Sequence, residues 1–70
     1  MSDKLNYVLH HKNWTGLTLL ELIESGRIQK TSKSIIKSFA QSALGEANNF
    51  EEWEEQWEIV RLISEMEVSE

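Results

Sequence analysis

Apolar residues recur every three to four positions in three segments of the chain, and this spacing predicts a mainly α-helical fold. The helices are expected at about residues 18–25, 32–47 and 49–66. Each has an apolar face that a neighbouring helix can cover. Because the chain contains no proline and no low-complexity linker, residues 1–70 are interpreted as one compact three-helix domain.

Capping signals support the limits of these helices. Thr18 and Glu21 have the spacing of a capping box, in which the hydroxyl and the carboxylate bind the first unpaired amide groups of a helix. Asn49 and Glu52 have the same spacing before the third helix. Gly26 is expected to end the first helix in a left-handed conformation. In the second helix, Phe39 lies in the middle of the apolar stripe and is expected to be buried.

The N-terminal segment is open to more than one interpretation. Leu5, Tyr7 and Leu9 alternate with polar residues, which is typical of a short strand. Residues 26–30, centred on Ile28, would be its partner in a short N-terminal β-ribbon. An extended arm or an extra helical turn is the alternative.

The third helix has an unusually wide apolar surface. Its apolar residues lie in two adjoining strips and cover an arc of about 200°, against the roughly 100° that a surface helix needs. One strip contains Phe50, Trp53, Trp57 and Val60, and the other contains Ile59, Ile63 and Met66. Aromatic residues at helical spacing usually pack in a core, which favours Trp53 and Trp57 as core anchors. A domain this small is not expected to cover both strips, so one of them would meet a partner.

We expect the exposed pair to be Ile59 and Met66, because they lie farthest from the line of Phe50 to Trp57. The glutamates on the rest of the helix would keep the protein dissolved and steer it towards a basic surface, although a merely solvated acidic face is the simpler interpretation. The candidate partner-binding residues are Trp53, Glu54, Glu55, Trp57, Glu58, Ile59 and Met66.

Charge is distributed unevenly along the chain. The 70 residues have a net charge of −5, yet residues 1–45 carry +3 and residues 46–70 carry −8. A basic run in the first part suggests an alternative function in nucleic-acid binding, as in a small transcriptional regulator. Its candidate residues are Arg27, Lys30, Lys33 and Lys37. The acidic character of the whole chain and the lack of base-reading side chains at the start of the second helix place direct nucleic-acid binding second.

No motif for catalysis or for a cofactor is present. The chain has no cysteine, which excludes disulfides and thiolate chemistry. His10 and His11 are adjacent and point in different directions, whereas metal-binding histidines on a helix are usually four residues apart. We therefore expect no enzyme activity, no metal and no cofactor. With no long apolar run, neither a membrane span nor a signal peptide is expected, and the location would be the cytoplasm.

Together these patterns predict a non-catalytic regulator or inhibitor that binds a larger protein through its third helix. The target would have a basic surface, such as one that handles nucleic acid. Phage-encoded inhibitors, which act in the host cytoplasm, are proteins of this general type. A homodimer or another self-assembling structural subunit is the third alternative, since a 70-residue core supplies only about 3–5 kcal/mol.

Overall fold

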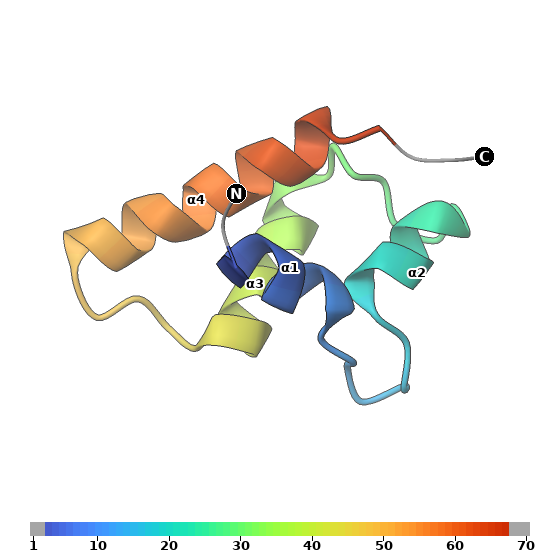
Figure 1. Cartoon of the computed structure of the whole chain (residues 1–70), viewed down its shortest axis with the longest axis horizontal. Coiled ribbons are helices and arrows are strands. Elements are labelled where there is room, and N and C mark those ends of the chain that lie inside the picture. Colours follow the sequence, from blue (N-terminus) through green and yellow to red (C-terminus); the bar gives the residue numbers. More distant parts are fainter. Residues whose placement is uncertain (1–2, 68–70) are drawn as a thin grey trace.

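The computed structural model describes residues 3–67, and these fold into four helices (Figure 1). Helix α1 spans Asp3–His10, α2 Leu19–Glu24, α3 Lys33–Leu44 and α4 Phe50–Glu65. The fold is mainly α-helical, as the sequence predicts, and the three expected helices correspond to α2, α3 and α4. No strand is present in residues 3–67, where the only β-type pairing is an isolated bridge between Lys12 and Thr18.

Helix α1 replaces the β-ribbon that the N-terminal alternation suggested, so that interpretation is wrong. Leu5, Val8 and Leu9 have the i, i+3, i+4 spacing of a helix face, and all three are buried. Tyr7, which completed the alternation, is 53% exposed. The alternating pattern was misleading because it left out Val8, which is 1% exposed and belongs to the core.

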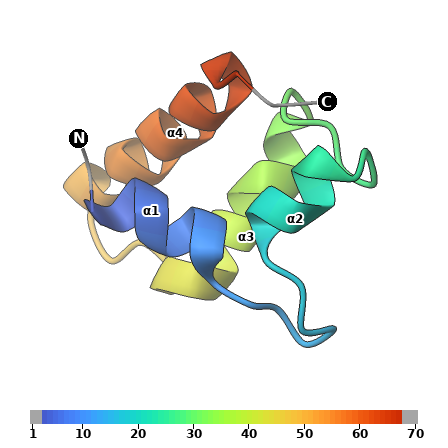
Figure 2. The ribbon, with the colours of Figure 1, turned by 45° about the vertical axis from the view of Figure 1, so that its right-hand side comes forward.

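The helices surround a single core. Helix α3 contacts both α1 and α4, and α1 also contacts α2 (Figures 1 and 2). Ile36 and Ala40 of α3 are fully buried, and the small Ala40 side chain lets a neighbouring helix approach closely. The core contains Leu5, Val8, Leu9, Leu19, Ile23, Ile36, Ala40, Ile59, Val60 and Ile63.

Phe39 lies at the edge of this core and is only half-buried, so the expectation of full burial is corrected. It lines a hollow of about 190 Å³ together with Trp14, Asn13, Ser38 and Ser42. A half-buried ring removes less apolar surface from water than a fully buried one, so Phe39 stabilises the fold less than its central position in α3 suggested.

Local hydrogen bonds confirm the predicted ends of α2 and the predicted start of α4, whereas α3 ends at Leu44, before the expected residue 47. The Thr18 hydroxyl accepts from the amide of Glu21 at 3.1 Å, and the Thr18 amide donates to the Glu21 carboxylate at 2.9 Å. Asn49 accepts from the amide of Glu52 at 2.9 Å, while the Glu52 carboxylate accepts from the amide of Asn48. Gly26 has the left-handed φ of 81° that glycine adopts without strain.

The capping box makes a pH-dependent contribution to stability. Hydrogen bonds from the Thr18 amide, and then from its side chain, hold the pKa of Glu21 below its ordinary value. Because the folded pKa is depressed, this stabilisation is present above the ordinary pKa and is lost as the pH falls through the folded one.

We expect Thr18→Ala to lower the free energy of unfolding by about 1 kcal/mol at neutral pH and to raise the pKa of Glu21, as measured by urea titration and by NMR. Thr31→Ala, at an exposed position outside any cap hydrogen bond in the described structure, is the matched control. Equal losses in the two variants would show that the box contributes nothing.

Candidate protein-interaction surface

Three aromatic residues at the start of α4 lie on the surface and form a continuous stripe. Along this side of the helix the exposed fraction falls from 68% at Phe50 to 48% at Trp53, 36% at Trp57 and 1% at Val60. Phe50, Trp53 and Trp57, called here the aromatic stripe, are therefore not core residues. The interpretation of Trp53 and Trp57 as core anchors is wrong.

The path of the chain explains why the stripe is uncovered. The side-chain amide of Gln56 donates to the carbonyl oxygen of Gly45 at 2.8 Å, which holds the end of α3 beside Gln56. At the opposite end, Lys30, just before α3, donates to the carbonyl oxygen of Met66. Helix α3 thus ends beside Gln56, and the first turns of α4 lie beside the linker 45–49 and, at Glu55, beside Lys4 of α1. Figure 1 shows this start of α4 at one end of the molecule.

The buried side of α4 is formed by the other strip. Ile59, Val60 and Ile63 are 1%, 1% and 0% exposed, and Gln56 is buried beside them. The expectation that Ile59 is exposed is therefore wrong. Met66 is half-buried and packs against the core, so it is not the exposed residue that the sequence suggested. The wide apolar arc is real, and its uncovered part is the aromatic strip.

The rings of the stripe contact one another. Phe50 and Trp53 are stacked, with centroids 5.6 Å apart and planes 17° apart. Trp53 and Trp57 meet edge to face at 6.3 Å. The amine of Lys37, from α3, lies over the Trp57 ring at 5.5 Å from its centroid, within the range of a cation–π interaction. The three rings thus form one ordered surface, and one of them already holds a cation.

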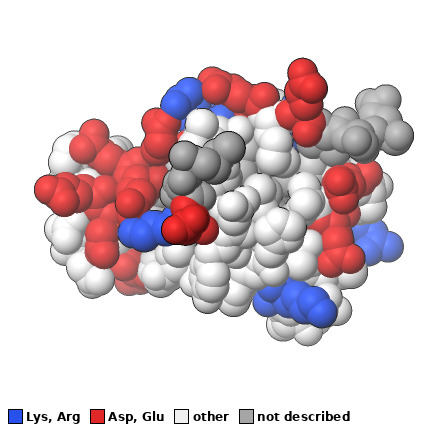
Figure 3. Space-filling view, viewed as in Figure 1, with Lys and Arg blue, Asp and Glu red and all other residues white. Residues whose placement is uncertain are grey.

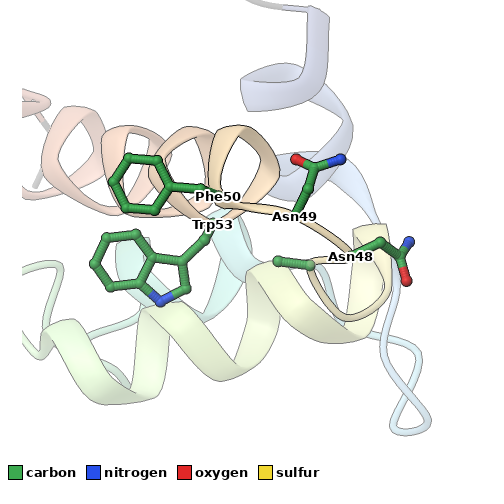
Figure 4. A pocket seen from close by; sticks show the side chains of 5 residues that line it. Asn48, Asn49, Phe50 and Trp53 are labelled. Carbon is green, nitrogen blue, oxygen red and sulfur yellow. The ribbon is translucent and has the colours of Figure 1, made fainter.

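An open hollow of about 440 Å³ lies against the first two rings. It is lined by Ala47, Asn48, Asn49, Phe50 and Trp53. Figure 4 shows both rings on the same side of α4, whereas the side chains of Asn48 and Asn49 point away from them. The hollow therefore offers an apolar, aromatic wall that the protein's own polar side chains do not cover.

The glutamates of α4 divide into paired and unpaired groups. Glu55 binds Lys4 at 2.5 Å. Arg61 binds Glu58, and the hydrogen bond that it donates to Glu58 lowers the pKa of that carboxylate. Arg61 also binds Glu65 at 3.0 Å. By contrast, Glu51 and Glu54 are exposed and have no ion-pair or hydrogen-bond partner within residues 3–67.

One of the two unpaired carboxylates lies beside the stripe. Glu54 follows Phe50 by four residues and precedes Trp57 by three, so it neighbours both on the helix surface. Acidic side chains crowd the end of the molecule where α4 begins (Figure 3). The start of α4 therefore combines exposed aromatic rings with two carboxylates, those of Glu51 and Glu54, that have no ion-pair partner within residues 3–67.

The basic residues of the alternative nucleic-acid site do not form one exposed group. Lys37 lies over Trp57, and Lys30 binds the carbonyl oxygen of Met66 at the end of α4. Arg27 and Lys33 are exposed. Two of the four cations thus serve contacts within the fold.

A third exposed tryptophan, Trp14, was missed by the sequence analysis. Trp14 is 95% exposed at the tip of the 11–18 loop. Asn13 closes this loop, since its amide donates to Leu17 at 3.0 Å and its carbonyl accepts from Gly16 at 2.9 Å. The sequence signal was available, because an asparagine and a glycine three residues apart are typical of a tight turn. Trp14 lies on a different element from the stripe and therefore serves as an internal reference for it.

Residues 3–67 contain neither a metal-binding cluster nor a membrane-spanning helix. No group of three or more histidine, aspartate or glutamate side chains in this range has an arrangement that would hold a metal ion. No helix in the same range is long and apolar enough to cross a membrane.

No protein-family model matches the chain, and no curated protein or solved structure matches it either. The function proposed next rests on the residues of this chain alone.

Proposed function

We propose that the protein is a non-catalytic regulator or inhibitor that binds a larger protein through the start of α4. The observation that carries the proposal is the aromatic stripe, exposed on an ordered helix and bordered by the unpaired carboxylate of Glu54, with unpaired Glu51 one helical turn before it. Exposed aromatic residues with a charged rim are typical of protein-binding surfaces, in which a few such residues supply most of the affinity.

The aromatic rings would supply the affinity. Trp53 is at the centre of the stripe, in contact with both Phe50 and Trp57. It is the residue whose remaining exposed surface a partner would cover most completely. Because α4 is already folded and its rings already pack together, binding would order few additional side chains, which favours affinity.

The unpaired glutamates determine the kind of partner. A neutral or acidic surface would leave Glu51 and Glu54 desolvated without a counter-charge, which costs several kcal/mol per buried ion. A basic surface would pair with them and would also attract the protein over a distance. A surface that normally binds phosphate groups meets this requirement, and glutamates on a rigid helix would then compete with nucleic acid for it.

We expect Trp53→Ala to weaken binding to a purified partner by at least about tenfold, because truncation of a central tryptophan typically costs more than 1 kcal/mol. The partner is to be isolated by cross-linking and affinity capture, and its dissociation constant measured by calorimetry. Trp14→Ala is the matched control, since it removes the same side chain from an even more exposed position. A partner that binds Trp53→Ala as tightly as the wild type, and loses affinity for Trp14→Ala, would place the interface on the 11–18 loop and contradict the proposal.

The charges are tested separately from the rings. We expect Glu51→Gln with Glu54→Gln to slow association and to reduce its dependence on salt, with a smaller effect on dissociation. The control is Glu24→Gln with Glu67→Gln, which removes two exposed acids at positions away from the stripe. Equal effects of the two pairs would mean that net charge alone, and no particular surface, attracts the partner.

A further inference from the structure

The three rings of the aromatic stripe have different surroundings. The Trp57 ring is covered by a cation of the protein itself, the amine of Lys37. Phe50 and Trp53 are more exposed and, within residues 3–67, no cation lies over either ring. The two rings that border the hollow are thus the part of the stripe where a cation from outside has room to bind.

The same part of the helix lacks counter-charge. Along α4, Glu55, Glu58 and Glu65 have basic partners within the chain, whereas Glu51 and Glu54 do not. Glu54 lies one helical turn after Phe50 and one before Trp57, so it borders the stripe, whereas Glu51 points about 100° away from Phe50 around the helix. An aromatic wall and the unpaired carboxylate of Glu54 therefore lie together on the surface.

This combination suits a guanidinium group better than other side chains. Guanidinium is planar, stacks on aromatic faces, and is more weakly hydrated than an ammonium group. Its donors also form a fork that binds carboxylates in a bidentate manner. A lysine ammonium is strongly hydrated and makes neither the stack nor the fork. An apolar side chain would fill the hollow but would leave the Glu54 carboxylate without a partner.

We propose that the hollow at the start of α4 binds an arginine side chain of the partner, stacked on Trp53 and Phe50 and paired with Glu54. This inference rests on the proposed function and specifies the chemistry of its partner. The protein would then select arginine-bearing basic surfaces over surfaces whose charge comes from lysine.

The test compares two peptides of equal length and charge, hexa-arginine and hexa-lysine, added to the full-length protein at low and at physiological salt. The indole N–H signals of the three tryptophans, observed by NMR, report where each peptide binds. Hexa-arginine is expected to bind at least about threefold more tightly than hexa-lysine, with the difference retained at higher salt because stacking is less screened than charge. The Trp53 signal is expected to shift most and the Trp14 signal least.

Two results would overturn the inference. Equal affinities for the two peptides would show that charge alone is recognised, and a dominant shift at Trp14 would place the site on the 11–18 loop. Neither result depends on a variant that must fold. As a further check, Trp53→Leu keeps an apolar side chain but removes the stacking face, so it should abolish the preference for arginine, whereas Trp14→Leu should retain it.

The peptide and partner experiments separate the two proposals. If hexa-arginine and hexa-lysine bind equally while Trp53→Ala still weakens the partner complex, the arginine site is wrong and the proposed function stands. If Trp53→Ala leaves the partner complex intact, the proposed function is wrong, whatever peptide the hollow prefers.

Discussion

Ile59→Lys is expected to unfold the protein. Ile59 is 1% exposed and belongs to the core of all four helices. Lysine at this position would bury an amine with no partner, which costs several kcal/mol, and would also lose the packing of the isoleucine. A domain of this size has only about 3–5 kcal/mol of stability to lose. Circular dichroism of the variant at 25 °C should therefore show little helix and no cooperative melting transition.

The matched control introduces the same lysine on the same helix. Phe50 is 68% exposed, so Phe50→Lys should change the free energy of unfolding by only about 0.5 kcal/mol or less. The pair of variants directly compares the two strips of α4. Cooperative melting of Ile59→Lys near the wild-type temperature, with unfolding of Phe50→Lys, would mean that the buried and exposed strips had been exchanged.

The second large effect is expected in α3, where two neighbouring isoleucines differ in burial. Ile36 is 0% exposed at the centre of the core, whereas Ile35 is 45% exposed. We expect Ile36→Ala to lower the free energy of unfolding by about 2–5 kcal/mol, because it removes buried carbon atoms and leaves a cavity. Ile35→Ala should cost less than about 1 kcal/mol, because Ile35 is already 45% exposed and its truncation removes less buried surface. Urea unfolding followed by tryptophan fluorescence measures both.

This comparison removes the same atoms from adjacent positions of one helix, so helix propensity and unfolded-state effects are nearly equal in the two variants. The difference between them isolates burial. Similar losses in both would indicate that a second chain covers Ile35 in solution, and the loss at Ile35 would then depend on protein concentration.

Short-range sequence signals were sufficient for the local structure. The capping box of Thr18 and Glu21, the Asn49 cap and the left-handed Gly26 are all present where they were predicted. Each involves atoms within a few residues of one another, so its geometry depends little on the rest of the fold. The accumulation of acids in residues 46–70 likewise follows from the sequence, and it makes the start of α4 acidic whatever the packing.

Long-range packing decided which side of each helix is buried. In α1, Val8 packs in the core with Leu5 and Leu9, so the buried residues have helical spacing although the sequence also alternates. In α4 the periodicity identified two apolar strips, but it could not say which would be covered, because a helical pattern specifies only the relative angles of its residues. That choice depends on where α3 ends, at the contact between Gly45 and Gln56.

The sequence alone therefore determined helices α2, α3 and α4, the caps of α2 and α4, and an apolar surface on α4 too wide for the chain to cover. Only the tertiary structure decided that Ile59 is inside and that Phe50, Trp53 and Trp57 remain at the surface. The physical reason is that α3 ends beside Gln56, so it does not cover the rings on the first turns of α4.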